Sequence, residues 1–184
     1  MTAFVISSCS KTEEIAPVTV VGIWKGNGLG VVTDTKTVDV TIDEIKKLDA
    51  KAGDGLAAQT FELKADGTSS IPKNSSSTVA TDAGKYVVSA DKKTLTITSS
   101  TEKDSKGNFS VQTFEIVKLT STELKLGISK LSKKNTDGTF AVDFLSIDFV
   151  TYLYGIYVFG AKGLDANVEL KNAKTLQTTY NLKK

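Results

Sequence analysis

Apolar and polar residues alternate along most of this chain, and a period of two is typical of β-strands. In AAQTFELKADGTSSI the pattern places Phe61 and Leu63 on one face before a turn at Asp66–Gly67. The segments KYVVSADKKTLTITSS and GNFSVQTFEIVKLTSTELKLGIS alternate in the same way and indicate two hairpins. The spacing of such segments predicts about eight to ten short strands, arranged as an antiparallel barrel or sandwich.

One segment near the start of the chain, TIDEIKKLDAKAG, follows the period of an α-helix instead. Thr41 and Glu44 have the spacing of a capping box, in which each side chain bonds to the backbone N–H of the other residue. Apolar residues recur at helical spacing from Ile42 to Ala52, and Gly53 is a typical stop. We therefore expect one short helix after the first strand.

The segment TFAVDFLSIDFVTYLYGIYVFG is rich in aromatic and β-branched residues, which favours a strand. Its apolar residues change phase between Phe144 and Leu145, and a β-bulge at this point would bring them back to one face. Asp143 and Asp148 would then lie on the opposite, solvent-exposed face. The last segment, NVELKNAKTLQTTYNL, is expected to form another hairpin.

Composition excludes several classes of function. All 23 basic residues of the 184-residue chain are lysines, and histidine is absent. The chain therefore has no Ser–His or Cys–His pair, no histidine ligand for zinc and no arginine to clamp a phosphate. A net charge of +2 is too small to indicate nucleic-acid binding. We expect a protein that is not an enzyme and that binds no metal or cofactor.

The one cysteine of the chain, Cys9, lies in the sequence FVISSCSKTEE. The residues ISSC resemble the box that ends the signal peptide of bacterial lipoproteins, so Cys9 is the expected lipid attachment site. Residues 1–8 would then be the end of a signal peptide, residues 9–18 a flexible tether and residues 19–184 the folded domain. The alternative is that Cys9 is an ordinary buried thiol, but serine and charged neighbours make a poor core environment.

Four short motifs resemble, in type and order, the lipocalin-like domains of Bacteroidetes lipoproteins: GIWK, LKADGT, KTLTI and LTSTELKL. The resemblance covers about residues 19–130. Ser10 and the pair Glu13–Glu14 also resemble lipoproteins that are sent to the outer membrane of such bacteria. The resemblance implies a lipid-anchored protein of the cell envelope, with an up-and-down antiparallel β-barrel around a small apolar cavity.

Gly22 and Trp24 match the G-x-W element of this family. In the family the tryptophan packs at one end of the barrel, usually against an arginine from a late strand. Because this chain has no arginine, that contact is either missing or made by a lysine, which is a poorer planar partner.

Four aromatic residues are the candidate ligand-binding residues: Tyr152, Tyr154, Tyr157 and Phe159. Tyrosine combines a rigid apolar face with a hydroxyl, which suits the mouth of a ligand site, and the alternative is a strand that lines the core. We expect the protein to bind a small apolar molecule in or at the mouth of the barrel. The alternative function is an outer-membrane interaction protein, whose filled barrel docks a protein or glycan partner through a surface patch.

Overall fold

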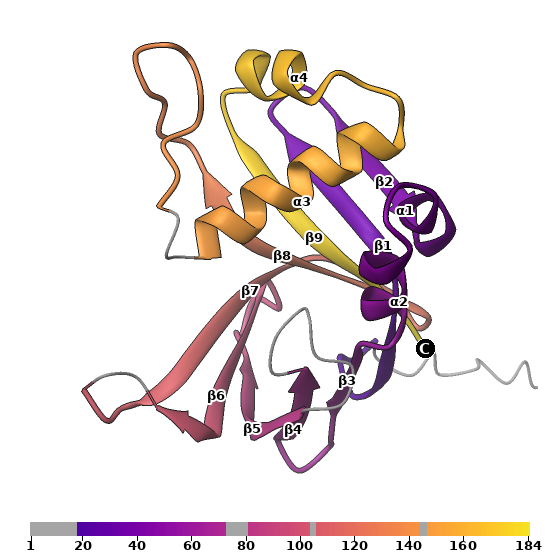
Figure 1. Cartoon of the computed structure of the whole chain (residues 1–184). Coiled ribbons are helices and arrows are strands. Elements are labelled where there is room, and N and C mark those ends of the chain that lie inside the picture. The colour runs from indigo at the N-terminus through magenta and orange to yellow at the C-terminus, as the bar shows by residue number, and fades with distance from the viewer. Residues whose placement is uncertain (1–17, 73–80, 104–105, 144–146) are drawn as a thin grey trace, which may run out of the picture.

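The computed structural model of the chain describes residues 18–72, 81–103, 106–143 and 147–184 (Figure 1). Cys9, the expected signal peptide and nearly all of the expected tether lie outside the described residues. Within the described ranges the fold is mainly β, as expected, and nine strands form one antiparallel sheet. The strands are β1 (Gly22–Thr33), β2 (Thr37–Thr41), β3 (Thr60–Leu63), β4 (Thr68–Pro72), β5 (Thr81–Val88), β6 (Thr94–Lys103), β7 (Phe109–Leu119), β8 (Glu123–Leu131) and β9 (Leu176–Lys183).

The sheet closes into a barrel because β1 pairs with both β3 and β9. The eight barrel strands, β1 and β3 to β9, follow one another around the barrel in sequence order, and each runs antiparallel to the next. The expected up-and-down antiparallel β-barrel is therefore confirmed. β2 lies outside this closed ring and pairs with the second half of β1.

β1 changes its partner on one edge at a β-bulge. Its residues 22–25 pair with β3 and its residues 28–32 pair with β2, while β9 runs along the opposite edge. The register shift between these two stretches moves the alternation of side chains by one position. Trp24 and Leu29 therefore share the interior side of the barrel wall, and both are buried.

The expected helix after the first strand is present, and Thr41 and Glu44 form the predicted capping box at its start. The expected stop at Gly53 is wrong, because a second helix continues past it. Asp49 caps this second helix by accepting a hydrogen bond from the N–H of Ala52 at 3.0 Å. The helices in the described ranges are α1 (Ile42–Leu48), α2 (Ala50–Ala57), α3 (Ile147–Ala161) and α4 (Ala166–Asn172).

The strand predicted over TFAVDFLSIDFVTYLYGIYVFG is wrong, because most of this segment is α3, while the predicted bulge at Phe144–Leu145 lies outside the described residues. The buried residues of α3 recur at helical spacing: Thr151, Gly155, Val158 and Phe159. Aromatic and β-branched residues lower helix propensity only slightly, and packing against the sheet overrides that preference. The predicted last hairpin is also wrong, since its first arm is α4 and its second arm is β9.

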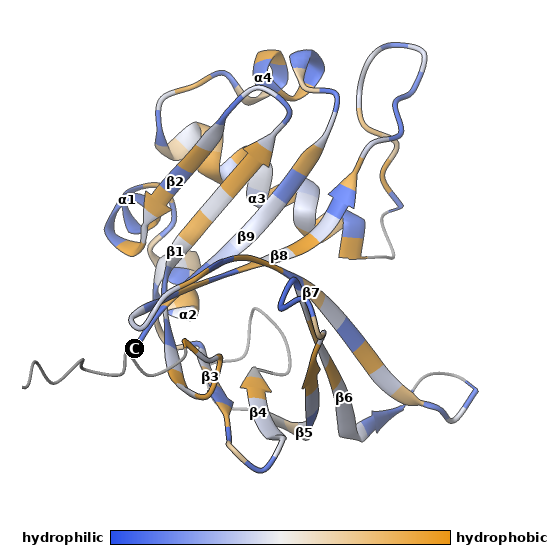
Figure 2. Ribbon diagram, turned by 180° about the vertical axis from the view of Figure 1, so that it is seen from behind, coloured by the Kyte–Doolittle hydropathy of each residue, from blue (hydrophilic) through white to orange (hydrophobic). Residues whose placement is uncertain are grey.

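α3 lies across β1, β8 and β9, beyond the part of the barrel that β3 to β7 close (Figure 1). The alternation of hydrophobic and hydrophilic residues along these strands is visible in Figure 2. The buried apolar side chains form two clusters, and Tyr180 on β9 packs against both. α3 therefore covers the same side of the sheet that faces the barrel interior.

We name the two clusters by their positions. The barrel cluster lies inside the closed ring and consists of Val20, Trp24, Phe61, Leu63, Ile71, Leu95, Ile97, Phe114, Leu124, Leu126 and Leu182. The helix cluster lies under the helices and consists of Leu29, Val31, Val40, Ile45, Leu56, Leu131, Phe140, Val158, Phe159, Leu170, Ala173 and Leu176.

Candidate functional site

A pocket of about 530 Å³ lies where α1, α2 and α3 meet β1, next to the bulge at which β1 leaves β3. This position is the mouth of the barrel, because β1 leaves its ring partner β3 at the bulge and pairs with β2 beyond it. The floor of the pocket is apolar and buried, and it consists of Leu29, Ile45 and Leu56. Tyr154 and Tyr157 of α3 form a half-buried wall.

Close backbone packing holds α2 against β1 and so fixes one side of the pocket. A Cβ atom on Gly26 would collide with the backbone carbonyl oxygen of Leu56, so only glycine allows this approach. Charged and more exposed residues of the α1–α2 segment surround the opening: Asp49, Lys51 and Asp54. The pocket thus has an apolar floor and a charged rim.

Tyr154 also connects the pocket to the core of the barrel. Its ring meets the ring of Tyr180 edge-on, with 6.1 Å between the centroids, and Tyr180 contacts Phe61 of the barrel cluster at 5.9 Å. Burial raises the pKa of the Tyr180 hydroxyl well above its ordinary value, and the neighbouring Tyr154 hydroxyl raises it further. Tyr180 therefore stays uncharged at neutral pH and well above it, which suits its position between two apolar clusters.

The structure brings two of the four candidate aromatic residues together at this pocket. Tyr154 and Tyr157 are three residues apart on α3, so they share one face of the helix. Tyr152 lines a separate pocket of about 280 Å³ beside Phe140. Phe159 is fully buried in the helix cluster and contributes to packing instead.

The floor of the pocket was not identified from the sequence. Leu29 lies in the stretch GNGLG, whose glycines suggest a turn, but β1 continues through it because the glycines allow close packing. Ile45 was recognisable as part of the apolar stripe of a helix. The spacing of three residues between Tyr154 and Tyr157 could have indicated that they share one face. This interpretation holds only if the segment is recognised as a helix.

Trp24 lies in the barrel cluster with its side chain fully buried, and its indole N–H donates a hydrogen bond to the Val20 carbonyl at 2.6 Å. The Nζ atom of Lys184 lies 4.5 Å from the centre of the Trp24 rings. A Cβ atom on Gly22 would come within 2.6 Å of the Lys184 side chain, so the glycine leaves room for this lysine. A lysine thus stacks on the tryptophan by a cation–π contact.

Side chains of the barrel cluster fill part of the closed ring. The residues of the barrel cluster are each at most 5% exposed and pack against one another. The pocket at the mouth is lined by residues of the helix cluster and by none from the barrel cluster. A ligand bound there would therefore lie at the mouth and outside the packed ring.

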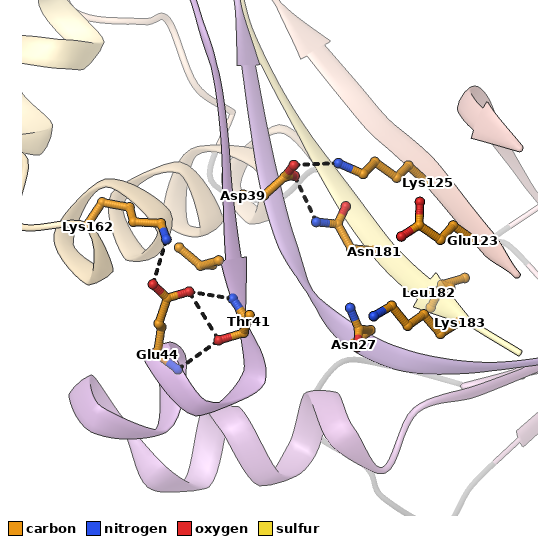
Figure 3. A pocket seen from close by; sticks show the side chains of 11 residues that line it. Asn27, Asp39, Thr41, Glu44, Glu123, Lys125, Lys162, Asn181, Leu182 and Lys183 are labelled. Carbon is orange, nitrogen blue, oxygen red and sulfur yellow. Dashed lines mark hydrogen bonds and ion pairs between the residues drawn. The ribbon is translucent and has the colours of Figure 1, made fainter. Parts of the chain in front are cut away.

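A second pocket, of about 200 Å³, is polar and lies where β1 changes its partner (Figure 3). Asp39 of β2 accepts hydrogen bonds from Asn181 at 2.9 Å and from Lys125 at 2.5 Å. Glu44 of α1 forms an ion pair with Lys162, just beyond α3, and this contact contributes most to lowering the pKa of Glu44 to about 2. These interactions tie β2 to β8 and β9, and α1 to the end of α3.

No family model, curated protein or solved structure matches the chain. In the described ranges, no three acidic or cysteine side chains converge as a possible metal site. Over the same residues, no helix combines the length and apolar character needed to cross a membrane.

Proposed function

We propose that this protein is a non-enzymatic, lipocalin-like binding protein that holds a small apolar molecule at the mouth of its barrel. The pocket beside α2 and α3 supports the proposal, because its volume of about 530 Å³ falls within the range of small-molecule sites. The buried floor of Leu29, Ile45 and Leu56 would gain contacts with an apolar ligand. The charged rim would keep a polar end of the ligand in water.

We also propose that the protein is anchored to the bacterial outer membrane by a lipid on Cys9. The support is the motif ISSC and the polar stretch that follows it. A labelled fatty acid supplied to cells that express the full gene should enter the wild-type protein and not the Cys9→Ser variant. Equal labelling of both proteins would contradict the proposed lipid anchor on Cys9. It would leave the proposal that the pocket binds an apolar molecule unchanged.

The packing of the barrel cluster favours a second candidate function. The buried side chains of the barrel cluster pack against one another, which suits a barrel filled by its own residues, as in an outer-membrane protein that docks a protein or glycan partner. In that case the pocket at the mouth would be a surface feature without a resident ligand. The two functions differ in whether an apolar probe binds at this pocket.

Filling the pocket from one side tests the proposed function. Ala52 of α2 is half-buried and lines the pocket, whereas Ala57 of the same helix is exposed and lies outside it. We expect Ala52→Phe to weaken binding of a fluorescent apolar dye at least about tenfold, since one aromatic ring occupies much of the volume. Ala57→Phe, which adds the same ring to the same helix, should bind the dye as the wild type does.

Thermal melts of both variants establish that they are folded, so that a loss of binding reflects the pocket. A wild-type protein that binds no apolar dye contradicts the proposal and favours the docking protein. Dye binding that Ala52→Phe leaves unchanged places the binding elsewhere on the molecule.

A further inference from the structure

The polar pocket of Figure 3 is lined by three carboxylates, and each of them is already bonded to a lysine. The three ion pairs, each with 2.5 Å between nitrogen and oxygen, are Asp39–Lys125, Glu44–Lys162 and Glu123–Lys118. The lysines therefore compensate the negative charge of these lining residues before any ligand binds.

Lys183 of β9 also lines this pocket but has no carboxylate of its own. Among the residues that the structure describes, no carboxylate forms an ion pair with it. Glu123 lies opposite Lys183 on β8, but its carboxylate bonds to Lys118. The hydrogen bond from Lys118 does most to lower the pKa of Glu123, and Lys183 adds only a weaker electrostatic attraction. Lys183 thus leaves positive charge uncompensated at this end of the pocket.

A second lysine faces Lys183 across the ladder between β1 and β9. Lys25 of β1 is the register partner of Lys183, and within the described ranges it also forms no ion pair. Their sequence neighbours Trp24 and Leu182 are buried inside the barrel, so both lysines point outward from the same face. Like charges directly opposite each other destabilise a pair of strands. An anion between the two ammonium groups would replace this repulsion by attraction.

The β-bulge of β1 adds an uncharged donor beside the two lysines. Asn27 lies at the register shift between Gly26 and Gly28, and its side chain lines the pocket. Figure 3 shows its amide directed to the same part of the pocket as the Nζ atom of Lys183. In the part of the chain that the structure describes, this amide has no hydrogen-bond partner, whereas the side chain of Asn181 bonds at both ends.

These groups define the chemistry of a ligand. Two ammonium groups and an amide N–H₂ are free to donate, and the neighbouring carboxylates are neutralised by other lysines. Lysine binds a phosphate or a carboxylate as a point charge, so the site needs no arginine. The pocket volume of about 200 Å³ lies below the range of drug-sized ligand sites, so the ligand has to be small.

We propose that Lys25, Asn27 and Lys183 bind a small oxyanion, a phosphate or carboxylate group, on the outer face of the barrel. The two lysines supply the charge, and the Asn27 amide donates a neutral hydrogen bond that fixes the position of one oxygen. The apolar pocket lies on the other face of the sheet, under α2 and α3. The oxyanion site is therefore independent of the function proposed for that pocket.

Titration of the full chain with inorganic phosphate, and separately with acetate, tests the site at constant ionic strength. We expect the side-chain amide signals of Asn27 in NMR spectra to shift saturably, with a dissociation constant of about 1–10 mM for phosphate. Lys183→Gln should weaken binding at least about fivefold. Lys85→Gln, at an exposed position of β5 outside the pocket, should bind as the wild type does. Melting curves establish that both variants fold.

The absence of saturable binding of either anion below about 100 mM overturns the proposal. Binding that Lys183→Gln leaves unchanged also overturns it, because the anion would then lie elsewhere on the molecule.

Asn27→Asp gives an independent test, because it places a carboxylate where the oxyanion is expected to bind. This variant should melt above the wild type in phosphate-free buffer and bind phosphate at least about tenfold more weakly. Asn172→Asp, at an exposed position of α4 outside the pocket, adds the same charge and should keep the wild-type affinity. Wild-type phosphate affinity in Asn27→Asp contradicts the proposed site.

Vesicles distinguish a lipid headgroup from a free phosphate as the source of the anion. The Cys9→Ser chain is sedimented with vesicles of phosphatidylglycerol or of phosphatidylcholine. Sedimentation with phosphatidylglycerol alone, lost in Lys183→Gln, supports the site and assigns the phosphate to an anionic lipid. A chain that binds inorganic phosphate but neither kind of vesicle supports the site with a free anion as its ligand.

Discussion

At the scale of single residues, Tyr157 and Tyr152 form a natural comparison on one helix. Both are half-buried on α3, but Tyr157 lines the apolar pocket and Tyr152 lines a different one. Tyr157→Ala removes part of a pocket wall and should weaken binding of an apolar dye by about 1–3 kcal/mol. Tyr152→Ala should leave dye affinity close to that of the wild type. Fluorescence titration measures both affinities, and equal losses in the two variants would contradict the assignment of this pocket.

The sequence identified these aromatic residues but could not show which of them meet. In a strand, Tyr154 and Tyr157 would point to opposite faces, because side chains alternate with a period of two. In a helix they share one face, because residues three apart are neighbours on the surface. To predict that Tyr154 and Tyr157 line the same pocket, it was therefore necessary to recognise this segment as a helix, although its composition favours a strand.

At the scale of elements, local signals were reliable where they were chemically specific. The capping box of Thr41 and Glu44 correctly placed the start of α1. α3 was missed because its aromatic and β-branched residues favour a strand, and only its burial against β1, β8 and β9 makes the helix stable. The ion pair between Glu44 and Lys162 joins residues 118 positions apart, so no local pattern indicates it.

This ion pair makes the attachment of α1 to the end of α3 dependent on pH. The folded-state pKa of Glu44 is lowered from 4.5 to about 2, chiefly by Lys162 and then by hydrogen bonds from Thr41. A lowered pKa means that the ionised form stabilises the fold fully above pH 4.5, and that this stabilisation is lost as the pH falls through about 2. Glu44→Gln should therefore melt below the wild type at pH 6, and the difference should shrink steadily between pH 4.5 and 2.

Asp43→Asn provides the matched control for this measurement. It removes one negative charge from the same helical turn but leaves the capping box and the Lys162 ion pair in place. Melting temperatures across the pH range should show a smaller difference from the wild type than Glu44→Gln does. A Glu44→Gln difference that persists unchanged at pH 2 would show that the glutamate acts through packing and not through its charge.

At the scale of the whole molecule, the alternation of apolar residues was sufficient to predict an antiparallel barrel or sandwich, because period and turn spacing indicate an antiparallel sheet. The choice of the barrel came from the resemblance of short motifs to lipocalin-like domains. The alternation could not predict that β1, β8 and β9 extend past the ring and carry a second core under α3. The two clusters share these three strands and meet at Tyr180. Such continuity favours a single cooperative unit over two independently stable halves.

Phe159 and Trp24 allow a test of whether the two clusters unfold together, because Phe159 lies in the helix cluster and Trp24 in the barrel cluster. Phe159→Ala should destabilise the protein by about 3–5 kcal/mol, as expected for a fully buried aromatic residue. Trp24 is the only tryptophan, so its fluorescence reports on the barrel cluster specifically. If the molecule unfolds as one unit, Phe159→Ala shifts the denaturant midpoint measured by Trp24 fluorescence as far as the midpoint measured by far-UV circular dichroism.

Ile156→Ala, at an exposed position of the same helix, is the control and should shift both midpoints little. A Trp24 transition that stays in place while the helical signal is lost early would show that the two clusters unfold separately.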